Sequence, residues 1–274
     1  MLKDITLGQY FPGKSPLHTM DPRMKLLLTI FYIVILFFAK SVYAFAWMLL
    51  STFVLILCSG LSFKLLIKGV KPIFFILLFT GVINLFFTKD TQDPLFSFWI
   101  FIVYPKGVYT AIFMIVRILC LVLGSSLLLT YTTTPRALTD AIERLLSPLN
   151  LLNIPVYDFA MMMSLALRFI PTLLEDTVKI MNAQKARGAD FESGSLIKRA
   201  KALLPVLIPL LVTAFRRSND LAVAMECRCY MGGKGRTRMK QLRLHASDLL
   251  AALLFLAFGA ALFSCNYIPT GIRL

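Results

Sequence analysis

Acidic residues are scarce in this sequence, and charged residues of either sign are few. Asp and Glu together number 14 among 274 residues, and charged residues make up 16% of the chain. A soluble domain has about a quarter charged residues and about half apolar ones. Here 58% of the residues are hydrophobic, and the mean hydropathy is +0.77. The composition excludes intrinsic disorder and argues strongly against an ordinary soluble globule.

Cysteine is also rare, and positive charge is in excess. Five scattered cysteines are too few for a secreted disulfide scaffold. Lys and Arg number 29, which gives a net charge of +15. An excess of this kind suits nucleic acid, but in an apolar chain the positive-inside rule for membrane proteins explains it better. We therefore expect a membrane protein that binds no nucleic acid.

Five uncharged or nearly uncharged stretches are candidates for membrane spans, each near the roughly 20 residues that a spanning helix needs. We predict an all-α polytopic membrane protein in three parts. Residues 1–130 form an N-terminal membrane region, 131–245 a cytoplasmic region of helices, and 246–274 a C-terminal transmembrane helix. The first part holds four spans, at about residues 26–39, 41–63, 72–88 and 107–130. Residues 95–109 read as an external β-hairpin or a re-entrant segment.

Basic residues set the expected orientation. They gather in the N-terminal segment, in a loop with Lys64, Lys68 and Lys71, and in residues 131–245, which hold seventeen basic and nine acidic side chains. All three segments are cytoplasmic if the N-terminus is inside. We predict a membrane protein with its N-terminus and residues 131–245 in the cytoplasm and its C-terminus outside.

The cytoplasmic region is too charged to span a membrane and has helical periodicity. A short helix is expected from Thr134 to near Pro148, and two long ones from near Pro155 and from Ser195. Each long helix covers about 30 residues, or about 45 Å, and joins an apolar first half to a charged second half. Such amphipathic helices suit a membrane-facing surface that docks a partner, or else a purely structural subdomain.

Each long helix ends at an arginine between small residues. Arg187 lies between Ala186 and Gly188, and Arg228 lies between Cys227 and Cys229. Small neighbours let another backbone approach while the guanidinium forms forked bonds to carboxylates. The alternative is ordinary capping of a helix C-terminus by a cation and a glycine. Two such ends suggest two similar docking sites for two similar partner subunits.

Other motifs carry less weight. Residues 8–15 match the P-loop pattern, but they have too little chain before them for a strand, and prolines follow. Cys227 and Cys229 are too close for a usual zinc site and have no nearby histidine, so we predict no metal. His18 and His245 flank spans and suit interfacial positions. Arg117, inside a span, is a packing residue, a snorkelling residue or a partner contact.

No predicted span contains Asp or Glu, and Asp248 only borders the last one. A transporter driven by protons or sodium usually carries an intramembrane carboxylate. If the chain takes part in transport, its energy source should lie on another chain. A stand-alone secondary transporter or channel is the alternative function, and no residue cluster supports a membrane enzyme.

Several motifs together resemble a known family. These are residues 15–18 (Ser-Pro-Leu-His), residues 21–26 (Asp-Pro-Arg-Met-Lys-Leu), Thr134-Pro135 with residues 138–141 (Leu-Thr-Asp-Ala), and the two arginine motifs. Over nearly its whole length the chain resembles the transmembrane T component of energy-coupling factor (ECF) transporters. These EcfT-like, CbiQ-type proteins belong to bacterial ABC-type importers of vitamins and trace metals.

The resemblance implies a non-catalytic scaffold that couples ATP hydrolysis to transport. Its coupling helices would dock on two ATPase subunits, one through Ala186, Arg187 and Gly188 and the other through Cys227, Arg228 and Cys229. ATP and Mg would be bound on those subunits, so this chain itself would hold no cofactor.

A substrate-binding S component, exchangeable if several share this chain, would reorient for vitamin or trace-nutrient uptake. It would contact the apolar helix faces, since methionine repacks easily against different surfaces; membrane-side packing is the alternative role. The expected contacts are Met161, Met162, Met163, Leu207, Leu210 and Leu211.

Overall fold

The computed structural model describes residues 10–13, 15–88, 96–98, 101–152, 155–191, 195–232 and 245–267. The chain divides into two compact units. The membrane unit comprises Gly8–Leu138 and Leu242–Leu274, and the helix-pair unit comprises Met1–Leu7 and Thr139–Gln241.

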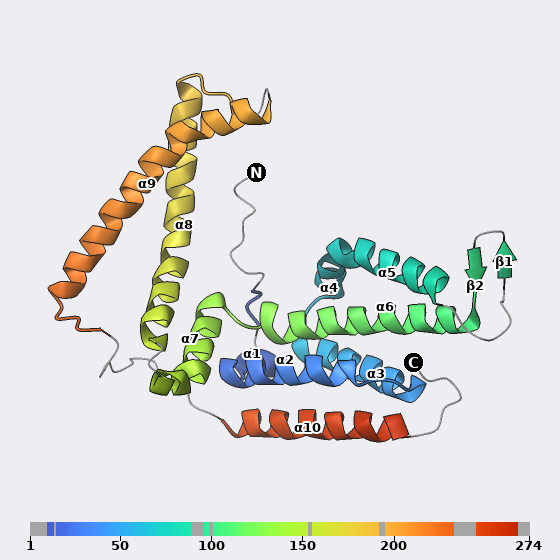
Figure 1. The fold of residues 1–274 in the computed structure, drawn as a ribbon. Helices are drawn as coiled ribbons and strands as arrows, with labels where there is room; N and C mark the ends of the chain where they lie inside the picture. Colours follow the sequence, from blue (N-terminus) through green and yellow to red (C-terminus); the bar gives the residue numbers. More distant parts are fainter. Residues whose placement is uncertain are drawn as a thin grey trace. The chain divides into compact units, whose positions relative to one another are not determined.

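The described part of the membrane unit is almost entirely helical (Figure 1). A 3₁₀ turn at Lys71–Ile73 joins α4 to α5, and a π-helical turn at Ser126–Thr130 continues α6. Its helices are α1 (Pro16–Thr19), α2 (Pro22–Phe37), α3 (Val42–Ser59), α4 (Phe63–Val70), α5 (Phe74–Phe87), α6 (Pro105–Ser125) and α10 (Ala246–Tyr267). Strands β1 (Phe96–Phe98) and β2 (Phe101–Val103) pair antiparallel, which confirms the hairpin expected within residues 95–109.

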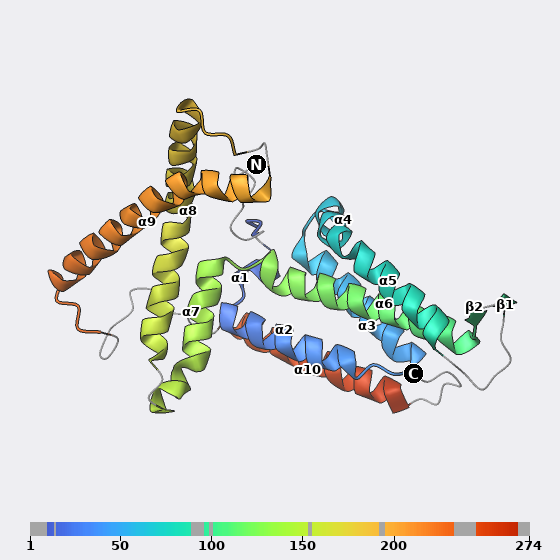
Figure 2. The same cartoon turned by 45° about the horizontal axis from the view of Figure 1, so that its top comes forward.

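Helix α6 packs against α2, α3 and α5, while α10 packs along α2 and α3 (Figure 2). At the centre lies Tyr32, which is fully buried. Its hydroxyl lies 2.9 Å from Oγ1 of Thr52 and donates to the carbonyl of Cys120 at 3.4 Å. A Cβ at Gly124 would overlap the Tyr32 ring, so a glycine there lets α6 approach α2 closely.

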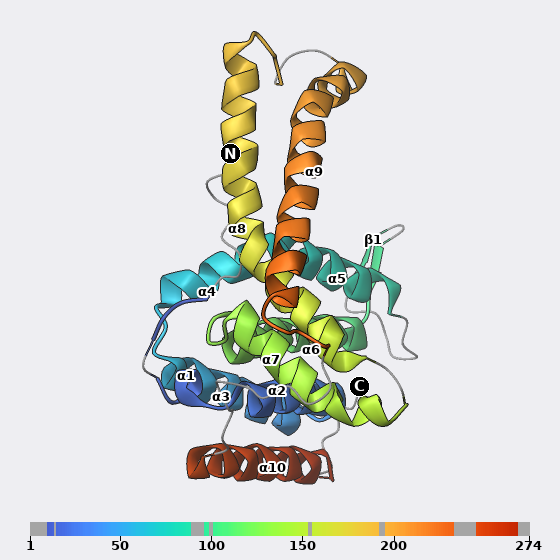
Figure 3. The same ribbon diagram turned by 90° about the vertical axis from the view of Figure 1, so that its left-hand side faces the viewer.

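The helix-pair unit is built on two 31-residue helices, α8 (Val156–Ala186) and α9 (Leu196–Glu226). Helix α7 (Pro135–Leu146) and a 3₁₀ turn (Ser147–Leu152) precede them. The two long helices pack against each other and run antiparallel (Figure 3). Their ends lie where the sequence periodicity placed them, and Ser195 caps α9 by accepting from the Lys198 amide.

Among the residues that the structure describes, five helical segments are long and apolar enough to cross a membrane, as expected for an all-α polytopic membrane protein. They are Val42–Ser59, Phe63–Phe87, Pro105–Thr130, Val156–Ala186 and Ala246–Tyr267. The set differs from the predicted one at two places. The first predicted span falls in α2, which has only 16 residues and is about 24 Å long. Helix α8, which we placed in the cytoplasm, meets the criteria with the lowest hydropathy of the five.

The structure differs from the prediction at the end of the second span and in the segment that follows it. The second span was expected to reach residue 63, but α3 ends at Ser59 because Gly60 adopts a left-handed conformation with φ of 64°. The basic segment after it was read as a loop, yet Lys64 and Lys68 lie in α4. With a leucine or isoleucine at 65, 66 and 67 between those lysines, the segment has an amphipathic pattern that suits a short helix.

Candidate functional site

The end of α8 is closed by its own backbone. The amide of Gly188 donates to the carbonyl of Lys185 at 3.0 Å, and the amide of Ala189 donates to the carbonyl of Gln184 at 3.0 Å. Gly188 has a φ of +88°. These two bonds around a left-handed residue define a Schellman motif. Arg187 is therefore the last residue before the chain reverses its helical sense.

The end of α9 repeats this geometry. The amide of Cys229 donates to the carbonyl of Glu226 at 2.8 Å, and the amide of Tyr230 donates to the carbonyl of Met225 at 3.1 Å. Cys229 takes the left-handed position with a φ of 56°, the one non-glycine residue with positive φ in the described ranges. Arg228 thus occupies the position that Arg187 occupies on α8. The sequence shows the similarity of the two triplets but not that Cys229 replaces a glycine conformationally.

Both triplets are exposed, including Arg187 and Arg228. Within the described ranges neither guanidinium has an ion-pair or hydrogen-bond partner. Backbone amides already bind the terminal carbonyls of both helices, so the caps do not require the arginine side chains. Because α8 and α9 are antiparallel, the two arginines lie at opposite ends of the helix pair (Figure 3). We call these ends the arginine tips, residues 186–188 and 227–229.

The predicted S-component contacts lie in the first halves of the same helices. Met162 and Met163 on α8, and Leu207 and Leu211 on α9, are exposed, whereas Met161 and Leu210 are partly buried. Neighbouring apolar residues on α9 are exposed as well, namely Leu203, Leu204, Ile208, Val212 and Phe215. Both helices therefore carry exposed apolar surface away from the arginine tips. The contact with an S component stays a prediction.

The N-terminal motif serves the packing of the membrane unit. Oγ of Ser15 lies 2.6 Å from Nδ1 of His18, and Nε2 of His18 lies 2.9 Å from the carbonyl of Phe11. Phe11 in turn donates its amide to the carbonyl of Tyr131 at 3.1 Å. The described part of the P-loop-like segment leads into the four-residue helix α1, which is far too short for the long helix that follows a phosphate loop.

Asp21 and Lys25 of the next motif are buried, at 5% and 1% exposure. Nζ of Lys25 donates to the carbonyl of Thr132 at 3.0 Å. Asp248, which the sequence placed only at the edge of the last span, is 1% exposed. Its carboxylate accepts from the amides of Asp21 at 3.0 Å and His245 at 2.9 Å. An acidic residue in the first turn of a helix was the available signal for this capping role.

Two further polar residues fix the opposite end of the membrane unit. Arg117 donates to the carbonyl of Ala39 and lies over the Phe45 ring, 5.2 Å from its centroid. Of the three roles left open for Arg117, the structure shows packing. Oδ1 of Asn266 accepts from the amide of Lys40 at 3.0 Å, and its amide nitrogen donates to the carbonyl of Phe38 at 2.7 Å. The role of Asn266 could not be predicted from the sequence, because a single amide in an apolar helix carries no pattern.

Across the described ranges, no group of three or more His, Cys, Asp or Glu side chains is placed to hold a metal ion. Cys227 and Cys229 are free thiols. The site is therefore a pair of exposed cationic helix ends beside apolar helix faces, an arrangement that suits protein contacts.

The amino-acid sequence matches a known class of transport proteins. Residues 13–239 match the family model CbiQ, described as cobalt transport protein, and the chain belongs to this family. Within it the chain is similar to proteins named energy-coupling factor transporter transmembrane protein EcfT. Those of Clostridium kluyveri and Ruminiclostridium cellulolyticum are 50% and 47% identical to it, over 92% and 98% of this chain and 93% and 99% of theirs. The Bacillus subtilis protein is 43% identical over 96% of this chain and 98% of its own length.

The comparisons confirm the resemblance that the motifs indicated. The chain is a transmembrane component of an ECF transporter and a membrane subunit of a multi-subunit complex.

Proposed function

We propose that this chain couples ATP hydrolysis by two separate ATPase subunits to the reorientation of a substrate-binding S component during uptake of a vitamin or trace nutrient. The observation that carries the proposal is the structural equivalence of the two arginine tips. Two backbone motifs of the same kind each present an arginine that has no partner within the described ranges, which suits two similar partners with carboxylates in a groove.

The proposal assigns the remaining roles as follows. ATP and Mg are bound on the ATPase subunits, and this chain contributes no catalytic residue and no cofactor. The exposed apolar faces of α8 and α9 pack against the S component, and the arginine tips lie on the cytoplasmic side. The relatives' name, which describes a transmembrane protein of an energy-coupling factor transporter, supports this division of labour.

Co-purification from detergent with candidate ATPase pairs tests the proposal. We expect wild type to retain both ATPases, Arg187→Glu and Arg228→Glu each to lose one contact, and the double variant to lose both. Loss of a charge-assisted bidentate contact weakens binding by about 2 kcal/mol or more, or about thirtyfold per tip. ATP hydrolysis by the retained complex is measured in parallel.

A matched control carries Lys179→Glu and Arg216→Glu, which make the same charge change at exposed positions on α8 and α9 away from the tips. We expect this variant to retain both ATPases. If the double variant Arg187→Glu, Arg228→Glu binds the ATPases as well as the control does, the two arginines are not the docking residues. If wild type binds no ATPase, transport by this chain alone becomes the better hypothesis.

A further inference from the structure

An ion pair joins helices α8 and α9. Nη2 of Arg217 lies 2.6 Å from Oδ2 of Asp176, and the two side chains are 32% and 16% exposed. Removing one member of such a half-buried pair leaves the other charge without compensation. The ion pair is therefore a specific contact that favours one crossing point of the two helices over neighbouring ones.

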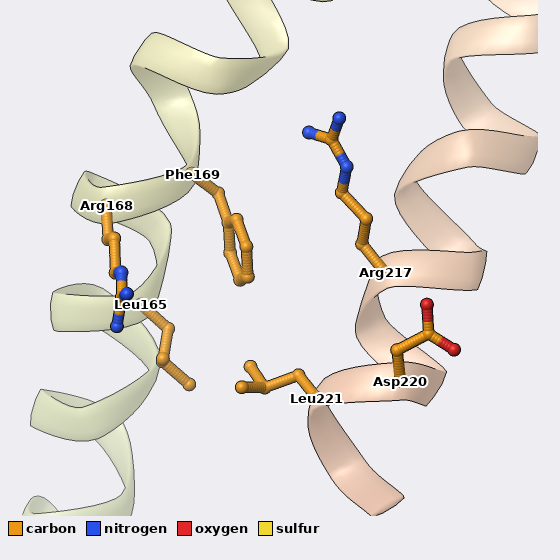
Figure 4. Close-up of a pocket in the computed structure, with 6 residues that line it drawn as sticks. All are labelled: Leu165, Arg168, Phe169, Arg217, Asp220 and Leu221. Atoms are coloured by element: carbon orange, nitrogen blue, oxygen red, sulfur yellow. The ribbon is translucent and has the colours of Figure 1, made fainter. Parts of the chain in front are cut away.

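An open cleft of about 310 Å³ lies beside this ion pair. It is lined by Leu165, Arg168 and Phe169 on α8 and by Arg217, Asp220 and Leu221 on α9. In Figure 4 the side chains of Leu165, Phe169 and Leu221 point into the space between the helices, whereas Arg168 lies along α8 and the Asp220 carboxylate points away from α8. In the part of the chain that the structure describes, neither Arg168 nor Asp220 has an ion-pair or hydrogen-bond partner. Two opposite charges thus line one cleft on opposite helices without forming a pair. Nη1 of Arg217 is buried and has no acceptor among the described residues.

The order of the charges fits a second ion pair. Because α8 and α9 are antiparallel, the residues before Asp176 on α8 lie on the same side of the ion pair as the residues after Arg217 on α9. Arg168 comes before Asp176, and Asp220 comes after Arg217, so both lie on that side. Arg168 is eight residues from Asp176, or about 12 Å, whereas Asp220 is three residues from Arg217, or about 4.5 Å. This difference in spacing keeps Arg168 and Asp220 apart while Asp176 and Arg217 are in contact.

We propose that Asp176 and Arg217 are positioning residues that set the crossing of α8 on α9, and that Arg168 and Asp220 form a second ion pair when the helices close over the cleft. Closure brings opposite charges together rather than like ones, so it replaces two solvated charges by an ion pair. The helices then have two defined arrangements, and the arginine tips at their far ends move between two relative positions. The closing step rests on the proposed function, because the ATPase subunits would supply the force that drives it. The role of the first ion pair does not depend on the proposed function.

The first ion pair is tested on the purified chain by thermal unfolding in detergent. Asp176→Asn, Arg217→Gln and the double variant form a double-mutant cycle. We expect the two substitutions to be coupled by about fivefold in the unfolding equilibrium constant. Arg168→Gln and Asp220→Asn form the control cycle, whose effects we expect to add because these residues are apart in the resting chain. Additive effects in the first cycle would overturn the positioning role.

The second ion pair is tested in the complex with the ATPases, by its rate of ATP hydrolysis. Arg168→Asp and Asp220→Arg each place like charges across the cleft, and we expect each to lower the rate by about fivefold or more. The exchange of both charges should restore it, which a merely structural role would not do.

The outcomes separate the hypotheses. Assembled complexes whose single variants keep the wild-type rate, or whose exchange variant stays as slow as the single ones, overturn the closing step alone. A wild-type chain that assembles no ATPase complex overturns both the proposed function and the closing step, and the unfolding cycle still decides the first ion pair.

Discussion

At the scale of single residues, Cys229 shows how the two arginine tips reach one geometry from different sequences. It occupies the left-handed position that Gly188 occupies on α8. For a residue with a side chain this conformation costs about 1–2 kcal/mol. The two cap hydrogen bonds at 2.8 and 3.1 Å hold it there. The departure of the second triplet from Ala-Arg-Gly is thus compatible with the same backbone.

We therefore expect Cys229→Gly to stabilise the α9 cap. The substitution removes the strain at φ of 56° and should stabilise the closed cap by about 1 kcal/mol. The equilibrium constant for opening the cap should therefore fall about fivefold. Hydrogen exchange of the Tyr230 amide, which donates one cap bond, measures this opening. The control is Cys227→Gly, at a φ of −58°, which should speed exchange because glycine disfavours the helical end. Equal exchange in wild type and Cys229→Gly would show that the position is unstrained.

The roles of single residues were harder to predict from the sequence than the positions of the helices. The arginine tips could be found because each triplet ends a long periodic stretch. Asn266 and the bond from Asp248 to Asp21 could not, since each joins residues more than 220 positions apart in the chain. A hydrogen bond to a distant amide depends on tertiary packing and leaves no spacing in the sequence.

At the scale of helices, periodicity predicted α8 and α9 well, because apolar residues recur at intervals of three and four over about 30 positions. The membrane helices were predicted less accurately at their ends. Their apolar stretches continue past the true boundaries, and a local feature such as Gly60 terminates the helix instead. The short helix α4 was missed because its lysines suggested a loop.

The end of α10 provides a test of how the membrane helices are joined. Asn266 accepts from the amides of Lys40 and Ser41 and donates to Phe38, all in the turn between α2 and α3. We expect Asn266→Ala to lower the free energy of unfolding in detergent by about 2 kcal/mol, since it leaves these backbone groups without partners. Asn266→Asp, which keeps the acceptor for both amides, should cost less. An alanine variant as stable as wild type would show that water or detergent replaces the amide.

At the scale of the whole molecule, the uneven distribution of charge determines the expected orientation. The excess of basic residues gathers in the segments predicted to be cytoplasmic, and the net charge is +15. In the described part of the chain, five helices are long and apolar enough to span a membrane, as many as the sequence predicts, but α8 is among them and the 16-residue α2 is not. Orientation therefore needs a direct measurement.

The five free cysteines offer this measurement. A chain keeping only Cys227 and one keeping only Cys265 are treated in intact cells with a membrane-impermeant maleimide. We expect Cys265, two residues from the end of α10, to react in intact cells, and Cys227 to react only after the membrane is opened. The reverse pattern would invert the predicted topology. Reaction of both in intact cells would place the α9 tip outside.

The closed caps at the two arginine tips also bear on how fast a complex assembles. A docking segment that folds only on contact must lose conformational entropy as it binds, which weakens binding. Here the backbone around Arg187 and Arg228 is already fixed by its own hydrogen bonds. A partner that recognises these tips meets a preformed surface, and only the arginine side chains must be ordered. We expect association to be limited by encounter and orientation rather than by folding, so that partners could exchange without remodelling the chain.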